Sequence, residues 1–253
     1  MIDVVIVNWN SGDHIVNCVN SINKHSGKLV WKIIVVDNNS NDESDIYVEN
    51  LPNVQLIRQK KNIGFAKGCN IGANYSNNKY LLFLNPDTLI YRNTLQKVFF
   101  FMESKENLNT AICGVQQRKS DGSVSRHSNR YPSLLSFIYL TIGFTSIYPK
   151  LGHVMGEWHH TESRKVDHVI GSFYFIRKNI FISHKGFDER FFMYLEDLDL
   201  SCRIKDSGFD SMYLSDVYIT HFCGGSSQKV KSYRLFYSLR SRLIFVEKYF
   251  GNI

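Results

Sequence analysis

Short apolar runs alternate with segments of helical periodicity along the first hundred residues. The runs that predict strands are Val4–Val7, Ile33–Val36, Val54–Ile57 and Tyr80–Leu84. Between the first two, the apolar residues at helical spacing are Ile15, Val16, Val19 and Ile22. Strands that alternate with helices are typical of βαβ units, so we expect an α/β fold with a mostly parallel sheet.

Two local motifs refine the helices of this first half. Ser40 and Glu43 have the S-x-x-E spacing of a capping box, which predicts that the second helix starts there. Gly64, Gly68 and Gly72 recur every four residues and would leave a smooth helix side for close packing or for a ligand. The sequence contains neither G-x-G-x-x-G nor a Walker loop, so dinucleotide-binding and P-loop enzymes lose their main support.

The pattern weakens between Arg118 and Lys165, where we expect an insertion or subdomain with exposed aromatic side chains. Regular elements then return. We expect strands at Val166–Arg177 and Met212–Thr220, a helix at Glu196–Asp206 that Gly208 ends, and a basic amphipathic helix at Ser232–Phe250.

Composition narrows the class of protein. At 253 residues and 43% hydrophobic content, the chain can bury a core without disulfides or metals. Its five cysteines are scattered and form no CxxC pair, as expected for reduced core thiols in the cytoplasm. The chain starts on a strand-like run and has no apolar run of about 20 residues, so we expect neither secretion nor membrane spanning.

The net charge of +7 is compatible with three partners: a nucleic acid, an anionic lipid surface or a phosphorylated substrate. Charge alone leaves all three open.

Polar residues follow three of the predicted strands, where an open α/β sheet binds its ligands. The three groups are Asn8-Trp9-Asn10, Asp37-Asn38-Asn39-Ser40 and Asn85-Pro86-Asp87. A single Asp after a strand is usually a turn former or a helix cap, but three such ends in one sheet indicate a ligand crevice. A carboxylate such as Asp87 is a ligand that Mg²⁺ or Mn²⁺ prefers.

A second acidic group lies at the start of the helix at 196–206. Asp199 and Arg203 form an i,i+4 pair with a structural role, which leaves Glu196 and Asp197 for chemistry or for simple N-capping. His221 ends a predicted strand and is either structural or a ligand. It precedes Cys223–Ser227, whose amide and hydroxyl donors suit phosphate oxygens.

Five blocks in this order resemble glycosyltransferase family 2, and within it bacterial rhamnosyltransferase-type enzymes. The blocks lie at 7–10, 36–40, 62–66, 84–87 and 194–200, and the resemblance runs from residue 2 to about residue 227. It implies a GT-A fold with a Rossmann-like sheet, a dTDP- or UDP-sugar donor, a Mg²⁺ or Mn²⁺ cofactor and inversion at the anomeric carbon.

The resemblance also implies roles for single residues. Asp37 would bind the pyrimidine ring, Asn85 would lie near the ribose, and Asp197 would be the general base. Asp87 and His221 would hold the metal, although Asn85 replaces the first Asp of the usual Asp-x-Asp. The other residues implied on the donor side are Asn8, Trp9, Asn10, Asn39, Asn62 and Gly64.

Acceptor recognition is then assigned to the variable region at 118–168. Trp158, His159 and Glu196 would contact the sugar, with Gly171 and Ser172 leaving room for it, although Trp158 could equally belong to the core. The implied parts are a donor half at 1–117, an acceptor and catalytic half at 118–227, and a C-terminal helix at 228–253.

Acceptors in this subgroup are commonly lipid-linked saccharides or cell-surface polysaccharides. The basic C-terminal helix would suit an anionic membrane at the inner face of the cell, a dimer interface or a solvated face.

The expected reaction is transfer of L-rhamnose from dTDP-rhamnose, with a UDP-hexose or UDP-N-acetylhexosamine donor as the alternative. A nucleotidyltransferase would need a basic, glycine-rich loop after the first strand, and Asn8–Gly12 has none. A nucleic-acid-binding module, suggested by the charge, would show steeply salt-dependent binding and no use for carboxylates at strand ends. We expect no nucleic-acid partner.

Overall fold

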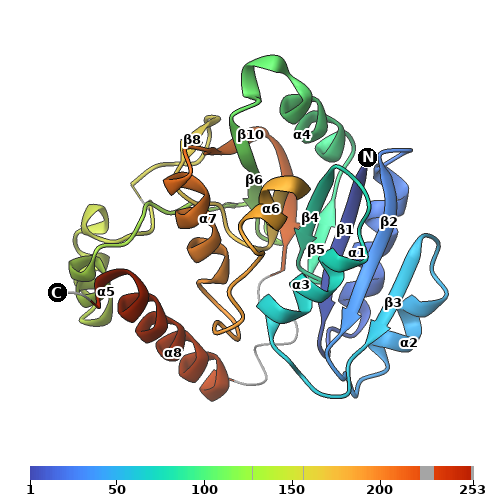
Figure 1. Cartoon of the computed structure of the whole chain (residues 1–253), viewed down its shortest axis with the longest axis horizontal. Coiled ribbons are helices and arrows are strands. Elements are labelled where there is room, and N and C mark those ends of the chain that lie inside the picture. The colour runs from blue at the N-terminus through green and yellow to red at the C-terminus, as the bar shows by residue number, and fades with distance from the viewer. Residues whose placement is uncertain (127, 156, 223–230, 252–253) are drawn as a thin grey trace.

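The computed structural model describes residues 1–126, 128–155, 157–222 and 231–251. Their strands form one ten-stranded sheet in the order β3-β2-β1-β4-β9-β6-β10-β5, with β7 paired to β6 and β8 to β10 (Figure 1). The strands are β1 (Ile2–Asn8), β2 (Val30–Asp37), β3 (Val54–Arg58), β4 (Tyr80–Leu84), β5 (Thr88–Ile90), β6 (Thr110–Arg118), β7 (Val124–Ser125), β8 (Arg164–Val166), β9 (Phe173–Arg177) and β10 (Asp210–His221).

Helices cover both faces of this sheet. The α-helices are α1 (Asp13–His25), α2 (Ser44–Glu49), α3 (Phe65–Asn74), α4 (Thr94–Glu103), α5 (Leu134–Thr141), α6 (Lys178–Ser183), α7 (Glu196–Asp206) and α8 (Lys231–Phe250). Short 3-10 turns lie at η1 (Lys105–Asn107), η2 (Phe144–Ser146) and η3 (Pro149–Leu151).

Alternate strand residues build two separate cores. In β1, Val4 and Ile6 pack with α1 and α4, whereas Val5 and Val7 pack with α3, α6 and α7. The alternation follows from the two-residue period of a strand. Each central strand is therefore apolar on both sides, as expected for a sheet with both faces covered.

The direction of the strands places the functional edge. From the pairings, β1, β2, β3, β4, β6 and β10 run in one direction, and β9 runs antiparallel to its neighbours β4 and β6. The sheet is thus parallel in its first half and mixed in its second. The carboxyl ends of the six strands that share a direction meet at a single edge, which carries the polar groups predicted from the sequence.

Most predicted elements are confirmed. Tyr80–Leu84 and the helix Glu196–Asp206 have the predicted bounds, and the other early strands extend by up to three residues at an end. The single strand predicted at Val166–Arg177 is wrong, because β8 and β9 are separated by residues 167–172. The backbone of that segment turns toward α7 instead of continuing in the sheet.

The predicted capping box is also wrong. The Ser40 hydroxyl donates to Asp37 Oδ1 at 2.6 Å, and α2 begins only at Ser44. Glu43 has a left-handed backbone (φ 64°), and its carboxylate accepts the Tyr47 hydroxyl at 2.9 Å. The Ser40 hydroxyl that a capping box would need is therefore bonded to the Asp37 carboxylate at the end of β2.

The glycine repeat has a packing role in α3. A Cβ at Gly72 would lie 2.4 Å from a methyl carbon of Val5, and one at Gly68 would lie 3.0 Å from methyl carbons of Val7. These two glycines let the helix approach β1 closely, which is the packing alternative considered for the motif.

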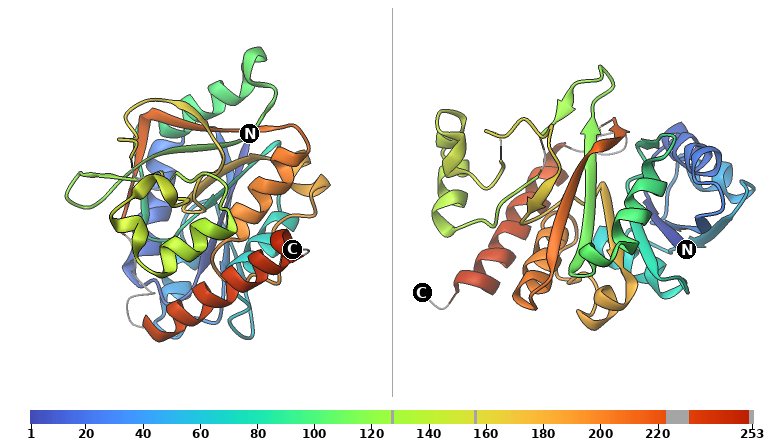
Figure 2. Two further views of the ribbon diagram at one scale, coloured as in Figure 1. Left: turned by 90° about the vertical axis from the view of Figure 1, so that its left-hand side faces the viewer. Right: turned by 90° about the horizontal axis from the view of Figure 1, so that it is seen from above.

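The region after residue 118 adds a third cluster. Phe137 of α5, Leu198 and Cys202 of α7, and Phe245 of α8 are buried together. Figure 2 shows α5 and α8 on the same side of the molecule, away from β2 and β3. Cys18, Cys69, Cys113 and Cys202 are free and buried as predicted, and Cys223 lies outside the described residues. None of the helices in the described ranges has the length and apolarity to cross a membrane.

Candidate active site

The carboxylate of Asp37 is fixed at the end of β2. Asn8 lies directly opposite it in the β1–β2 register and donates to Asp37 Oδ1 at 2.8 Å. Ser40 donates to the same carboxylate through its hydroxyl (2.6 Å) and its backbone N–H (3.0 Å). Asp37 is 3% exposed. These donors orient a buried acceptor at the rim of the crevice.

Polar atoms without a partner occur at the end of β1 and in the segments that follow β1 and β2. Within the described residues, Asn8 Oδ1, Ser11 Oγ and Asn38 Oδ1 are buried and have no hydrogen-bond partner. Buried polar atoms are nearly always paired with protein, water or a ligand. Their gathering at one strand edge is what a binding site for a polar group requires.

The remaining predicted donor residues line the same edge. Asn10 accepts the Asn41 N–H at 2.8 Å, Trp9 is half-buried and Asn39 is exposed. Asn10 and Asn39 both have left-handed backbones, with φ of 52° and 63°. The turns after β1 and β2 bond to each other, since Asn10 also donates its N–H to Ser40 Oγ at 3.0 Å.

Gly64 joins this edge to the loop that precedes α7. Its φ is +90°, and a Cβ there would lie 2.5 Å from the Phe192 carbonyl oxygen. The next residue, Phe65, donates its N–H to that carbonyl at 2.7 Å, and Asn62 Oδ1 accepts the Gly64 N–H at 3.0 Å. Only glycine allows both this backbone conformation and this contact.

The predicted metal ligands lie side by side. Asp87 Oδ1 is 3.2 Å from His221 Nε2, because β5 and β10 pair antiparallel with Thr88 opposite His221. The Asn85 amide nitrogen is 3.5 Å from the same imidazole nitrogen. In the described part of the chain, no three His, Cys, Asp or Glu side chains gather into a metal-binding group.

The chemistry of this pair fits a divalent cation. Gln117 Nε2 donates to Ser172 Oγ at 2.6 Å, which turns Gln117 Oε1 toward His221 Nδ1 at 3.2 Å. His221 then donates from Nδ1, and its Nε2 presents a lone pair toward Asp87. A cation or a shared proton would bridge two such atoms. With two protein ligands, Mg²⁺ or Mn²⁺ would take its other ligands from a diphosphate and water.

Sequence reasoning missed Gln117. Gln117 lies near the end of β6, where Gln116 and Gln117 follow an apolar run. Polar residues after an apolar run also predicted the sites at Asp37 and Asp87, so the same pattern could have identified Gln117. Through Gln117 and Ser172, the His221 side chain is connected to the segment between β8 and β9.

Asp197 lies in the first turn of α7. Its Oδ2 accepts the Gly171 N–H at 2.6 Å, and its Oδ1 accepts the Leu198 N–H at 2.8 Å. His168, also missed from the sequence, places Nε2 3.7 Å from Asp197 Oδ2 and Nδ1 3.2 Å from Ser201 Oγ. Burial lowers the pKa of His168, which favours a neutral imidazole beside the carboxylate.

Glu196, the neighbour of Asp197, differs in its environment. Burial, and then the charge of Asp197, raises the pKa of the Glu196 carboxyl well above its usual range. Its Oε2 has no hydrogen-bond partner in the described residues. A protonated carboxyl in this position can donate a hydrogen bond.

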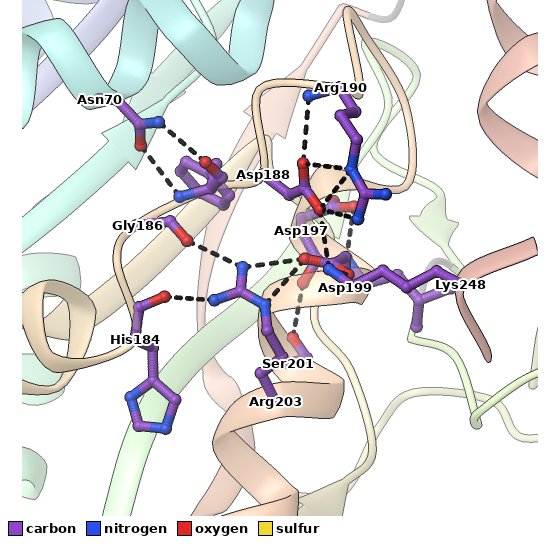
Figure 3. Close-up of polar contacts among 12 residues, drawn as sticks. Asn70, His184, Gly186, Asp188, Arg190, Asp197, Asp199, Ser201, Arg203 and Lys248 are labelled. Carbon is purple, nitrogen blue, oxygen red and sulfur yellow. Dashed lines mark hydrogen bonds and ion pairs between the residues drawn. The ribbon is translucent and has the colours of Figure 1, made fainter. Parts of the chain in front are cut away.

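The third acid of this turn is structural, as predicted. Asp199 is fully buried and bonds to Arg203 at 2.9 Å and to Lys248 at 2.5 Å (Figure 3). It also accepts the Tyr249 hydroxyl at 2.9 Å. Lys248 also binds Asp188 at 2.8 Å, so α8 is anchored to α7 and to the loop before it. Burial alone would raise the pKa of Asp188, but its bonds to Arg190 and Lys248 hold it below the usual range.

The predicted acceptor residues are only partly brought together. Gly171 and Ser172 lie beside Asp197 and Gln117, as described above. The Trp158 indole instead stacks on His160 with ring centroids 4.1 Å apart. It also makes an edge-to-face contact with Tyr213, with ring centroids 5.0 Å apart. His159 lies 3.0 Å from Arg126. Trp158 thus packs against the core, the structural alternative for this residue. The stretch Cys223–Ser227 lies outside the described residues.

Comparison with known proteins agrees with this geometry. The family model described as Glycosyl transferase family 2 matches residues 3–183. Rhamnosyltransferase WbbL of Escherichia coli K12 is 28% identical over 88% of this chain and 83% of its own length. The N-acetylglucosaminyl-diphospho-decaprenol L-rhamnosyltransferase of Mycobacterium tuberculosis is 25% identical over 97% of this chain and 84% of its own.

A solved structure of S. aureus TarS (1-349) in complex with UDP superimposes with a TM-score of 0.61 at 16% identity. The match covers 88% of this chain and 60% of the TarS chain, and it places the sheet and its helices in the GT-A fold. With this fold and the match over residues 3–183, the chain belongs to glycosyl transferase family 2.

Proposed function

We propose that the protein transfers L-rhamnose from dTDP-rhamnose to a saccharide acceptor, with inversion at the anomeric carbon, during synthesis of a cell-surface polysaccharide. One observation carries the chemistry: Asp37, Asp87 and Asp197 come from distant parts of the sequence and are held at one edge of the sheet. Asp37 ends β2, Asp87 lies beside His221 at the end of β10, and Asp197 accepts the N–H of Gly171 just before β9. Two relatives named as rhamnosyltransferases support the choice of sugar.

The chain's own residues divide the reaction between them. The acceptor hydroxyl oxygen forms a bond to the anomeric carbon as the bond from that carbon to the diphosphate oxygen breaks. The proton of the hydroxyl passes to the Asp197 carboxylate, and the nucleoside diphosphate leaves with the electron pair. Gly171 and Leu198 hold Asp197 in one orientation, so it need not reorganise during the transfer.

Asp37, with Asn8 and Ser40 behind it, would accept a hydrogen bond from the pyrimidine base. Asp87 and His221 would hold Mg²⁺ or Mn²⁺, which when bound neutralises charge that develops on the leaving diphosphate. Gln117 orients His221 for this task, and Asn85 lies beside it.

A second donor class has support of its own, because the TarS structure was solved with UDP. A UDP-hexose or UDP-N-acetylhexosamine would use the same carboxylates. The two donors differ at the base and the sugar, so direct comparison of nucleotides distinguishes them.

On the acceptor side, we infer a lipid-linked saccharide used at the cytoplasmic face of the membrane. The printed name of the mycobacterial relative includes a diphospho-decaprenol acceptor, which supports this class. Glu196, protonated beside Asp197, would donate a hydrogen bond to the incoming sugar.

The proposal is tested first by thermal unfolding with dTDP, UDP, GDP and ADP, each with and without Mn²⁺. A nucleotide at a hundred times its dissociation constant should raise the midpoint by roughly 5–10 °C. A metal-dependent shift that is larger for dTDP than for UDP supports rhamnosyl transfer. A shift with UDP alone retains the transferase and excludes dTDP-rhamnose. Salt-sensitive binding to nucleic acid without any nucleotide shift would overturn the enzyme.

A further inference from the structure

Two elements outside the proposed active site expose an unusual number of large apolar side chains. In the segment 134–151, which contains α5, η2 and η3, Leu135 is 57% exposed, Ile142 67% and Ile147 69%. In α8, Phe236 is 57% exposed, Leu239 45% and Leu243 71%. We call the surface made by these six residues the α5–α8 face.

The two elements lie on the same side of the molecule. Phe137 of α5 packs against Phe245 of α8 with ring centroids 5.8 Å apart, and in the left view of Figure 2 both elements lie at the front of the molecule. At 100° per residue, Phe236, Leu239 and Leu243 lie on the side of α8 opposite Phe245. The helix therefore has one apolar stripe in the core and a second that the described residues leave exposed.

The charges around this face are predominantly basic. Residues 133–155 contain one lysine and no Asp or Glu. In α8, Lys248 is paired with Asp188 and Asp199 on the core side, and Arg234 donates to the Tyr194 hydroxyl at 3.2 Å, so neither counts toward this face. Helical spacing places Arg240 on one side of the exposed stripe and Arg242 on the other, which is the arrangement of a helix that lies in the headgroup region of a bilayer.

From these observations we infer that the α5–α8 face docks on an anionic lipid bilayer. The apolar side chains enter the boundary between headgroups and acyl chains, and the flanking arginines contact lipid phosphates. A second copy of this chain fits less well, because a two-fold interface would bring the same basic residues together. The inference deepens the proposed use of a lipid-linked acceptor and rests on it for its biological meaning.

The test is sedimentation of the 253-residue chain with phosphatidylcholine vesicles that contain or lack phosphatidylglycerol. We expect binding to the anionic vesicles that weakens as salt is raised. Leu239→Glu and Leu243→Glu should each weaken binding by about tenfold or more. Arg240→Gln and Arg242→Gln should each cost about fivefold, on anionic vesicles only. Ile147→Glu tests the 134–151 segment in the same way and should also weaken vesicle binding.

Phe100→Glu is the matched control, because Phe100 is 66% exposed on α4, remote from this face. It should bind vesicles like the unchanged chain. Arg242 is half-buried and the other altered side chains are exposed, so equal thermal midpoints are needed to verify that the variants fold.

Equal binding to both kinds of vesicle, or no binding, would overturn the inference, as would full binding by Leu243→Glu. If Leu243→Glu instead converts a dimer to a monomer without changing vesicle binding, the face belongs to a second copy. Sedimentation involves no sugar transfer, so these failures leave the proposed reaction standing. If sugar transfer is absent while vesicle binding is intact, the proposed reaction fails and the membrane-docking inference stands.

Discussion

Asp197 Oδ2 accepts the backbone N–H of Gly171 at 2.6 Å. The next residue, Ser172, accepts the Asn85 N–H on its carbonyl oxygen at 3.2 Å and the Gln117 amide on its hydroxyl at 2.6 Å. Two consecutive residues thus connect the proposed base on α7 to the strand end that precedes Asp87. Because these contacts involve backbone, the spacing between the donor side and the base is set by the fold.

Replacing Asp197 with Asn should remove the proton acceptor, and its single amide oxygen can accept the Gly171 N–H only by giving up the bond from the Leu198 N–H. We expect kcat to fall by about a hundredfold to ten-thousandfold, with nucleotide affinity within a few fold of the original. Transfer assays and nucleotide titration of the same preparation measure both. A large loss of nucleotide binding or of folded protein would remove Asp197 from the role of base.

Glu196→Gln provides the matched control at the adjacent position. Burial, and then the charge of Asp197, raises the Glu196 pKa and favours the neutral carboxyl, whose charge the amide reproduces. Most of the transfer activity should remain. A group with a raised folded-state pKa stabilises the fold below its unfolded pKa and loses that contribution as pH rises, so the variant should gain stability most at alkaline pH. If Glu196→Gln is inactive while Asp197→Asn keeps its activity, the two carboxyl groups have been assigned the wrong way round.

Gly171→Ala tests the backbone contact itself. A Cβ at this position would lie 3.1 Å from Asp197 Oδ2, closer than ordinary contact, so the carboxylate must move by a few tenths of an ångström. We expect kcat to fall by about tenfold to a hundredfold with little change in nucleotide affinity, since misplacement of a catalytic group affects the chemical step. Steady-state kinetics that show only a raised donor KM would place Gly171 on the donor side instead.

The metal proposal predicts different effects for Asp87 and Gln117. Asp87→Ala should abolish the Mn²⁺-dependent part of the nucleotide thermal shift. Gln117→Leu leaves both ligands but removes the partner that orients His221, and should raise the Mn²⁺ concentration needed by about tenfold. Isothermal titration of nucleotide at several Mn²⁺ concentrations distinguishes them. A metal response unchanged in Asp87→Ala would remove this residue from the site.

The polar residues at the strand ends could be predicted from the sequence because they follow directly after apolar runs. Apolar runs identify the strands, and parallel neighbours bring their polar ends together, so Asn8, Asp37 and Asn85 were found without a structure. The predicted helix at Glu196–Asp206 is confirmed for a similar reason, since its acidic start and its glycine stop are both local.

What sequence reasoning missed depends on distant contacts. His168 appeared to belong to a continuous strand, and only the docking of residues 167–172 on α7 brings it to Asp197. The Ser40 hydroxyl could either cap a helix or donate to the Asp37 carboxylate, and in the structure it donates to Asp37. Trp158 had the composition of a sugar-binding side chain, but the ring of His160 covers one of its faces.

His153 predicts how the fold responds to acid. It is 8% exposed and its Nδ1 has no partner in the described residues, so burial, with the charge of Arg242 next, lowers its pKa from 6.5 to about 4. Above pH 6.5 the imidazole is neutral in both the folded and the unfolded chain, and no stability is lost. As the pH falls toward 4, the unfolded chain binds the proton first, which lowers the free energy of unfolding by up to about 3 kcal/mol.

His153→Leu removes this proton site at similar side-chain volume, so it should flatten the acid limb of the stability profile. Urea unfolding of both proteins at neutral pH and near pH 4 measures the difference. His168 remains in the variant as a buried imidazole with a lowered pKa, so some acid sensitivity should persist. If both proteins lose the same stability between neutral pH and pH 4, His153 takes up its proton in the folded state as easily as in the unfolded state. The acid response would then come from His168 and from paired carboxylates such as Asp188.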